Sequence, residues 1–443
     1  MSDRIGIVGG GLLGLGLAER LRGAGNAVTV FEAAPQLGGL AAPWQLGPIA
    51  WDKFYHVILQ SDSFTQGLID RLGLRSDFIG VETKTGFFTD GKLHSMSNSL
   101  EFLKFPPLGL VGKFRLALTI LHASRTTDWK KLERTPLVEW LMHWSGKKTV
   151  EKIWKPLLRA KLGESYRIAS AAFIWATIQR MYAARKSGLK KELFGYVRGG
   201  YGRMIEAYSK LLTESGVELR CASPVARIDS EPGVGPSIEL KSGERFGFDK
   251  IICTAVPELA AKMIPDLNPA ERELFQGVKY QGIVCASVVL KSPLSRFYVT
   301  NLTDDWVPFT GVIEMTALVD PIEFGGRTLI YLPKYADAND PIFRESDDSI
   351  RDRFLAALEK MYPHFHRDSV EAFQVARVKA VFPIPTLSYS ERLPPMKTRL
   401  SGVFCANSSH IVNGTLHVNE TLQRAERAAS LVLMEAAHAP AGV

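Results

Sequence analysis

The sequence predicts an α/β fold in which two domains are interleaved along the chain. Stretches at the start, middle and end alternate short apolar runs with helical runs, as in a parallel sheet flanked by helices. Residues 95–195 have broad apolar faces at helical spacing, and residues 269–400 hold several β-rich runs. We therefore expect a discontinuous domain from residues 1–94, 196–268 and 401–443. The second domain would combine a mixed β-sheet (269–400) with a helical insertion (95–195).

The start of the chain fits a nucleotide-binding unit of Rossmann type. An apolar strand at residues 5–8 leads into Gly9, Gly11 and Gly14, then a helical run and a second strand that ends at Glu32. The first glycine permits a tight turn, the second lets a pyrophosphate approach the backbone, and the third lets helix and strand pack closely. The helix N-terminus offers N–H groups to the phosphates. A carboxylate at Glu32 would bind ribose hydroxyls and repel a 2′-phosphate, which disfavours NADP.

The residues after Glu32 indicate which dinucleotide is bound. Ala33 follows the acid, and the pair Gly38 and Gly39 comes a few residues later. An acid at the strand end followed by a Gly-Gly pair resembles the flavin-binding start of the amine oxidase, protoporphyrinogen oxidase and phytoene desaturase superfamily. UDP-galactopyranose mutases share this feature. Most members have Arg after the pair, where this chain has Leu40. The resemblance implies that the cofactor is FAD.

The middle and the end of the chain resemble the same superfamily. The glycine-rich residues 199–202 and a helix lead to a strand and then to Val225, whose backbone contacts the adenine in relatives. A late strand at residues 403–406 ends at Asn407, where the family has a Gly-Asp pair, and residues 415–418 precede the last helix. Asn407 would accept a hydrogen bond from the ribityl chain, and the helix N-terminus would stabilise the reduced flavin. The cofactor-binding residues implied in this way are Gly9, Gly11, Leu12, Leu13, Gly14, Glu32, Ala33, Gly38, Gly39, Leu40, Val225, Asn407, Thr415, Leu416, His417 and Val418.

The catalytic candidate is His56. Residues 51–56 resemble the family segment in which an acid and a histidine close the flavin site, and a histidine suits a proton shuttle because it titrates near neutrality. A histidine bonded to backbone at a domain seam would show the same pattern, and Asp52 is expected to be a structural partner. Lys334 is a candidate for the flavin-facing lysine of amine oxidases, and Glu314, an acid in an apolar run, needs a partner or a ligand. Aromatic candidates for the pocket wall are Tyr298, Trp306, Phe309, Phe382 and Tyr389.

The composition is that of an ordinary globular protein. The four cysteines are isolated, and three lie in apolar runs, so we expect buried thiols rather than disulfides. No ligand spacing for a metal site is visible. The first strand begins close to residue 1 and no apolar run reaches about 18 residues, so a cytoplasmic location is expected.

The positive net charge of +8 is unevenly distributed. Lys and Arg outnumber Asp and Glu more than two to one in residues 101–220. No nucleic-acid recognition motif accompanies this excess, so we expect no nucleic-acid partner. Residues 100–125 are apolar with interspersed cations (Lys104, Lys113 and Arg115), a pattern typical of a helix at the inner face of an anionic membrane. A helix that roofs the active site, or a solvated basic face, fits the same pattern.

These observations favour an FAD-dependent oxidoreductase that removes hydride from a C–N or C–C bond of a hydrophobic or amphipathic small molecule. Two alternatives stay open. One is a non-redox flavoenzyme resembling UDP-galactopyranose mutase, which would need arginines for a diphosphate; the candidates are Arg159, Arg180, Arg198 and Arg377. The other is a prenyl-lipid carrier of the GDP-dissociation-inhibitor type, against which the intact glycine set and Glu32 argue.

Overall fold

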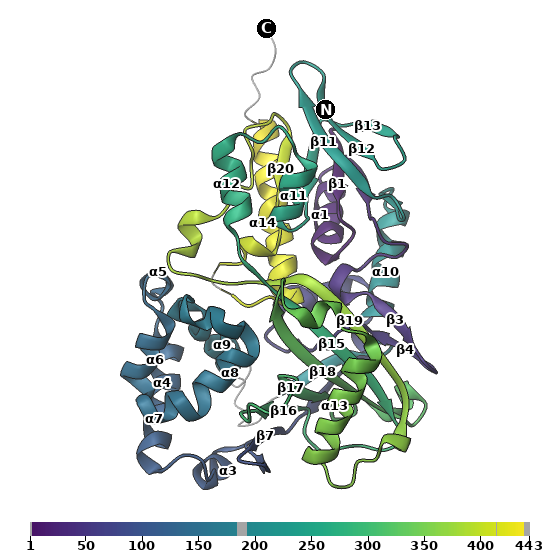
Figure 1. The fold of residues 1–443 in the computed structure, drawn as a ribbon. Helices are drawn as coiled ribbons and strands as arrows, with labels where there is room; N and C mark the ends of the chain where they lie inside the picture. The colour runs from purple at the N-terminus through teal and green to yellow at the C-terminus, as the bar shows by residue number, and fades with distance from the viewer. Residues whose placement is uncertain (1, 184–192, 413, 438–443) are drawn as a thin grey trace.

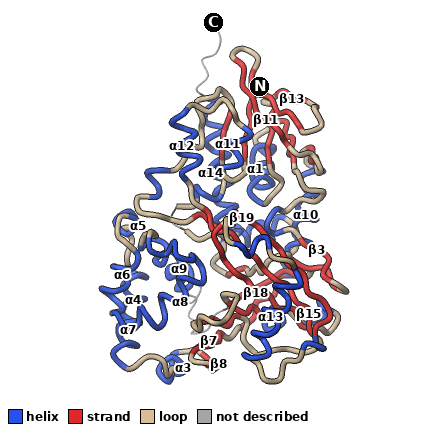
Figure 2. The backbone as a smooth tube through the Cα atoms, in the orientation of Figure 1, coloured by secondary structure: helices blue, strands red, loops and turns tan. Residues whose placement is uncertain are grey.

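The computed structural model describes residues 2–183, 193–412 and 414–437. Figure 1 shows a parallel sheet and its helices in the upper part of the molecule, a mixed sheet at the lower right and a group of helices at the lower left. The same separation is clear in Figure 2, where helices dominate the lower left and long strands cross the lower right. Among the described residues, no helix is long and apolar enough to span a bilayer.

The upper part is built on a five-stranded parallel sheet with strand order β10-β2-β1-β14-β20. In that order the strands are Glu218–Arg220, Ala27–Phe31, Arg4–Val8, Lys250–Cys253 and Val403–Cys405. Its strands therefore come from the start, middle and end of the chain, as the alternating pattern predicts. The helices of one face are α1 (Leu12–Gly23), α2 (Ser63–Arg71), α10 (Gly200–Glu214) and α14 (Val418–Ala437).

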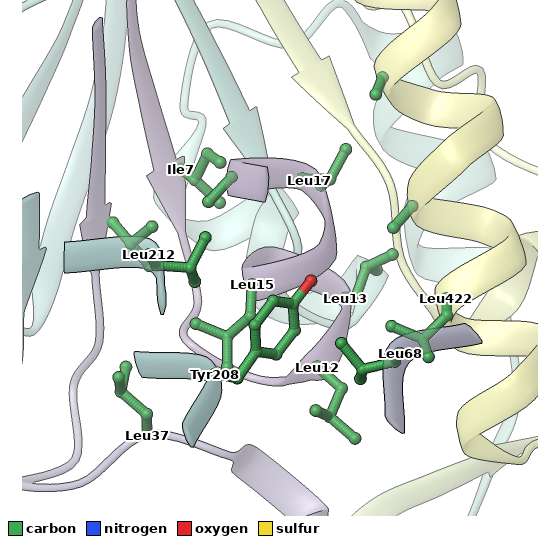
Figure 3. Packing of buried hydrophobic residues seen from close by; sticks show 14 of the residues in the cluster. Ile7, Leu12, Leu13, Leu15, Leu17, Leu37, Leu68, Tyr208, Leu212 and Leu422 are labelled. Atoms are coloured by element: carbon green, nitrogen blue, oxygen red, sulfur yellow. The ribbon is translucent and has the colours of Figure 1, made fainter. Parts of the chain in front are cut away.

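The two faces of this sheet follow from alternation along β1. Ile5 and Ile7 point into the helical side, where Figure 3 shows Tyr208 among the leucines of α1. Val8 points to the other side, into a core shared with Phe31 and Phe248. That side is covered by β11 (Val225–Glu231), β12 (Gly235–Leu240), β13 (Arg245–Gly247), α11 (Pro257–Met263) and α12 (Pro269–Gly277).

The second sheet has seven strands in the order β19-β15-β18-β17-β16-β7-β8. In that order they are Val370–Pro383, Tyr280–Leu290, Thr328–Asp337, Gly311–Glu314, Val299–Leu302, Thr85–Thr89 and Lys92–Ser95. All neighbours are antiparallel except β16 and β7. β7 and β8 come from the stretch assigned by sequence to the first domain, so that stretch contributes to both sheets.

The two faces of the mixed sheet meet different partners. Helix α13 (Asp347–Met361) covers one face. The other packs on a two-stranded sheet, β3 (Pro43–Leu46) and β4 (Ile49–Asp52), and a three-stranded sheet, β5 (Ile58–Leu59), β9 (Leu193–Val197) and β6 (Phe78–Glu82). The sequence does not predict β19, an edge strand in which charged residues such as Glu371, Arg377 and Lys379 interrupt the apolar pattern.

The described part of the helical insertion contains α3 (Ser99–Lys104), α4 (Leu110–Arg125), α5 (Trp129–Glu133), α6 (Leu137–Ser145), α7 (Lys147–Thr149), α8 (Lys155–Leu162) and α9 (Ala171–Ala183). The helical insertion has its own core, to which α4, α5, α6, α8 and α9 contribute buried residues and which Phe87 and Phe382 of the mixed sheet close. Apolar spacing alone predicts four helices, over residues 113–124, 136–144, 150–162 and 170–184, and these correspond to α4, α6, the segment that ends in α8, and α9.

Glu314, the last residue of β17, finds its partners in residues 294 and 295. Its Oε1 accepts a hydrogen bond from Leu294 N at 3.1 Å, and its Oε2 accepts from Ser295 N at 2.9 Å and from Ser295 Oγ at 3.0 Å. Burial outweighs these bonds and raises the pKa of Glu314 from 4.5 to about 7. The carboxylate therefore fastens the 294–295 loop, and the need for a ligand disappears.

Glu314→Gln is expected to change how stability depends on pH. Between pH 4.5 and 7 the folded protein keeps a proton that the unfolded chain has lost, so wild-type stability falls as pH rises through this window. The loss approaches about 3 kcal/mol, because each pKa unit is worth about 1.4 kcal/mol. Denaturant unfolding across this range should show a flatter profile for the variant, whereas the exposed Glu258→Gln should keep the wild-type slope. Equal slopes for wild type and Glu314→Gln would refute this.

Candidate cofactor and active site

The first glycine loop has the geometry of a phosphate cradle. Gly9 has φ +112°, and a Cβ there would lie 2.2 Å from Thr254 Oγ1; a Cβ at Gly14 would lie 1.9 Å from Gly9 O. A Cβ at Gly11, in contrast, meets nothing closer than Gly39 Cα at 3.9 Å. Two glycines are thus needed for packing, while Gly11 keeps open the space that a pyrophosphate would occupy. The side chains of Leu12 and Leu13 are buried, so only their backbone faces this space.

Glu32 ties three segments together at the end of β2. Its Oε2 accepts a hydrogen bond from Gly10 N at 2.7 Å, and its Oε1 accepts from Ala34 N at 2.8 Å. Its backbone N–H donates to Arg220 O, and its carbonyl accepts from Ser223 N at 2.8 Å. Each carboxylate oxygen still has a lone pair for a ribose hydroxyl. Ala33, beside it, is exposed.

The second glycine pair lies directly against the first loop. Gly38 and Gly39 have φ of +110° and +58°, and Gly38 N donates to Gly10 O at 2.9 Å. A Cβ at Gly39 would lie 3.3 Å from Gly11 Cα. The two glycine segments, separate in sequence, thus form one narrow backbone cleft. Leu40 is half-buried and packs on the core of the mixed sheet.

Val225 lies on the same side as Glu32. Ala222 N donates to Ala34 O at 2.8 Å, which holds the segment that leads into β11 against the acid. Val225 itself begins β11 and is half-buried at the edge of the core under the sheet. The structure therefore brings the expected adenine-side residues together.

Both polar atoms of the Asn407 side chain are hydrogen-bonded within the protein. Its Oδ1 accepts hydrogen bonds from Ser409 N at 3.1 Å and Ser409 Oγ at 2.6 Å, and its Nδ2 donates to Ala255 O at 3.0 Å. A ribityl hydroxyl would have to displace Ser409 to bond this oxygen. Asn419, which suits an N-cap of the last helix, lies inside α14 and accepts a hydrogen bond from Phe64 N at the start of α2.

Residues 415–418 lead into α14, whose first residue is Val418. Thr415 is buried and its Oγ1 has no hydrogen-bond partner. Leu416 packs on the core of the helical insertion. The His417 side chain has free space beside it, yet the surrounding protein and the nearby cations Arg180 and Lys161 hold its pKa well below 6.5. His417 therefore lines an internal space of the protein.

His56 lies close to His417, and a positive charge on His56 would lower the pKa of His417. Burial lowers the pKa of His56 to about 4 against the opposing effect of a hydrogen bond to the backbone of Phe54, and its Nδ1 is buried with no hydrogen-bond partner. Its ring centroid is 5.1 Å from that of Tyr201. Asp52 accepts a hydrogen bond from Tyr201 N at 2.9 Å, and burial raises its pKa to about 8. Asp52 is thus a structural partner, as expected, and His56 is a neutral imidazole at pH 7.

Sequence reasoning misses a cation and two phenols beside these histidines. Lys161 Nζ, from the last turn of α8, donates to the Tyr335 hydroxyl at 2.5 Å, and this hydroxyl lies 2.9 Å from that of Tyr55. Lys161 Nζ also lies 3.9 Å from the ring centroid of Tyr335 and 5.6 Å from that of Phe382. A signal was present: Lys161 falls at i+7 from Trp154, on the apolar face of its helical segment, where a cation is unusual.

Lys334 does not join this group. It precedes Tyr335 on β18 and so faces the opposite side of the sheet, where Asp340 and Arg353 act on its charge. Its pKa is lowered mainly by burial. Lys161, rather than the predicted Lys334, is thus the lysine that lies among the aromatic residues.

The predicted wall residues divide into three groups. Phe382 and Tyr389 line a narrow cavity with Phe173 and Leu416. Phe309 is buried and touches a larger cavity of about 470 Å³ between α8 and β18, which is also lined by Tyr335. Tyr298 and Trp306 are not wall residues, because Tyr298 packs on Phe194 in the core and Trp306 lies on the surface under Lys360.

The arginines proposed for a diphosphate are dispersed or paired. Arg180 bonds both Asp62 and Glu420, at 3.1 and 3.2 Å. Arg159 pairs with Glu164 and Arg377 with Asp347, at 2.8 and 2.6 Å. Arg198 is exposed. These four side chains therefore do not form a cluster for a diphosphate.

Comparison with known proteins fits this geometry. The family described as flavin containing amine oxidoreductase matches residues 14–433. The chain belongs to this family. The match confirms the resemblance seen in the sequence, the flavin cofactor and the oxidoreductase class.

Individual relatives are distant. Hydroxysqualene dehydroxylase of Sinorhizobium fredii is 23% identical over 295 residues, which cover 60% of this chain and 65% of that protein. The 4,4'-diapophytoene desaturase of Staphylococcus haemolyticus is 23% identical over 324 residues, or 66% and 63%. The chain therefore matches less than two thirds of the length of either relative. An oxidoreductase from Methanosarcina mazei has the same fold, with a TM-score of 0.74 at 17% identity over 98% of this chain and 100% of that one.

Gly11→Val should abolish FAD binding and leave the protein folded. The new side chain has room in the cleft, but it fills the space where a pyrophosphate would approach the backbone. Gly14→Val is the matched contrast, because its side chain collides with Gly9 O and should destabilise the fold itself. Flavin absorbance and thermal unfolding of both variants test this. A folded Gly11→Val protein with wild-type FAD content would contradict the position of the cleft.

Proposed function

We propose that the protein is an FAD-dependent oxidoreductase that removes hydride from a C–C or C–N bond of a hydrophobic or amphipathic substrate. The observation that carries the proposal is the half-buried group formed by Lys161, Tyr335 and Tyr55 beside the neutral His56. The electrons would pass on to oxygen or a quinone.

The cleft between Gly11 and Gly39 would hold the pyrophosphate, and Glu32 would hold the ribose. Backbone at residues 415–418, before α14, would face the flavin end of the cofactor. When bound, FAD supplies the acceptance of a hydride, which no side chain of this protein can supply.

His56 is the proposed proton acceptor. Loss of hydride from one atom of a saturated bond must be accompanied by loss of a proton from its neighbour. The Nδ1 of His56 is buried and without a hydrogen-bond partner, and the low pKa of the ring keeps it neutral at pH 7. A neutral imidazole in this state can accept a proton and cannot donate one as an acid.

The charges around the site favour a C–C bond over a protonated amine. Lys161 bonds a phenol rather than a carboxylate, whereas Arg180 is balanced by Asp62 and Glu420. The pKa of Asp52 is raised to about 8, so this acid is mainly neutral at pH 7. An ammonium substrate would thus meet an uncompensated cation, while a neutral or anionic amphipathic molecule would not.

Two further observations bear on the substrate. The open cavity of about 470 Å³ reaches Tyr335, one member of the Lys161 group. The two distant relatives are named for a dehydroxylation and a desaturation, and neither name mentions an amine. The mutase-like alternative is weakened because the four candidate arginines are dispersed.

His56→Ala should retain FAD and slow flavin reduction by about 10²–10⁴-fold, the usual contribution of a general base. Wild-type reduction should be insensitive to pH between 8 and 6 and should fall as the pH approaches 4, where the imidazole becomes protonated. Anaerobic single-turnover bleaching measures this step apart from product release. His364→Ala, on the far side of the mixed sheet, is the control. Wild-type rates in His56→Ala would make His56 a packing residue.

An anaerobic bleaching screen with alkylamines, polyprenyl lipids and porphyrinogens tests the substrate class. Neutral or anionic amphipathic compounds should reduce the flavin, and alkylamines should not. Lys161→Met should weaken the response to an anionic substrate by about tenfold to a hundredfold, as expected for one charged hydrogen bond. Lys155→Met, on the same helix but paired with Glu151 at the surface, should respond as wild type. Bleaching by alkylamines alone would contradict the proposed substrate class.

A further inference from the structure

An unusual apolar surface lies on α3 and α4 of the helical insertion. We call it the α3–α4 face and define it by Leu100, Leu103, Leu110, Val111, Phe114, Leu118 and Leu121. Leu110, Val111 and Phe114 are 78%, 74% and 70% exposed, and Leu100 and Leu103 are 62% and 57% exposed. The large exposed apolar residues elsewhere in the described chain, such as Val234, Leu259 and Ile322, are single and scattered. A continuous face of this kind marks an interaction site.

The face is a second apolar side of a helix that is already packed. Leu116, Thr119 and Ala123 of α4 are buried in the insertion and satisfy the fold. Phe114, Leu118 and Leu121 recur at helical spacing and leave their side chains in water. Folding alone therefore does not explain the outer stripe.

Cations surround this face. Lys104 ends α3, Arg125 ends α4, and the exposed Lys147 and Lys148 lie on α7, which meets α4 where Gly112 approaches Thr149. The two other cations expected from sequence to meet lipid do not do so. Lys113 is buried and donates to Leu103 O at 2.6 Å, and Arg115 donates to Trp144 O and His143 O.

Three acids lie near these cations. Glu101 accepts hydrogen bonds from Ser95 Oγ and Ser97 N, and Asp128 caps α5 through Lys131 N. Glu151 pairs with Lys155 at 2.9 Å, and its pKa is lowered mainly by that pair and also by Lys147. The cations around the face, Lys155 included, therefore outnumber the acids. The face therefore presents apolar side chains framed by positive charge.

We propose that the α3–α4 face docks the protein onto an anionic lipid bilayer. The apolar side chains would enter the boundary between headgroups and acyl chains, and the four cations would meet lipid phosphates. A second copy of the chain fits less well, because two such faces would bring their positive fringes together. This proposal concerns the surface of the insertion and does not depend on which substrate is oxidised.

Vesicle flotation of the full-length, FAD-loaded protein tests the proposal. Wild type should float with equimolar phosphatidylcholine and phosphatidylglycerol, and less so with phosphatidylcholine alone or at high salt. The double variant Leu110→Glu, Phe114→Glu should lower partition by roughly tenfold or more, since each side chain loses its burial in lipid. Val234→Glu, Ile322→Glu carries the same charge change outside the face and should float as wild type. All four positions are exposed, so the variants are expected to fold. Retained flavin absorbance checks that each variant is folded.

Three results would overturn the proposal. In the first, wild type stays in the unbound fraction with both kinds of vesicle. In the second, the double variant and wild type float equally. In the third, sedimentation would show a wild-type dimer that the double variant dissociates, and the face would then be an interface between copies of the chain.

Discussion

The four hydrogen bonds of Glu32 are the constraint on which the candidate site depends. Its two carboxylate oxygens hold Gly10 and Ala34, while its backbone holds Arg220 and Ser223. One residue thus joins the first glycine loop, the turn after β2 and the segment that enters β11. A ligand-binding acid that also fixes the loop around the ligand combines recognition with preorganisation, so little reordering is needed on binding.

A second constraint joins the helical insertion to the nucleotide-binding part. Arg180 of α9 bonds Asp62 before α2 and Glu420 in the first turn of α14. Burial raises the pKa of both acids although the arginine lowers it. Removing one partner from such a group leaves a buried charge without compensation, so the contact fixes geometry more than it adds stability. It keeps the insertion, which carries Lys161, in a constant position relative to His56 and His417.

The parts of the fold and site that are local in sequence could be predicted. Gly9, Gly11, Gly14 and Glu32 lie in one βαβ unit, where each spacing has a steric reason. The insertion helices follow from apolar periodicity. The group of Lys161, Tyr335 and Tyr55 could not be predicted in this way, because its members come from α8, β18 and the loop after β4 and meet only after the sheets have packed.

The incorrect expectations have a common cause, because sequence does not show what a polar side chain bonds. Lys334 was a reasonable lysine candidate, but strand alternation turns it away from Tyr335. Lys113 and Arg115 read as exposed cations, whereas both bind carbonyl groups of neighbouring segments. In each case tertiary packing, rather than local propensity, decides the role.

A crystal structure of the FAD-bound protein would test the proposed cofactor site most directly. We predict the pyrophosphate between Gly11 and Gly39, the ribose on Glu32, and the flavin ring within reach of His56, His417 and Lys161. A pyrophosphate outside the glycine cleft, or a flavin ring on the opposite side of the mixed sheet from Tyr55, would contradict it.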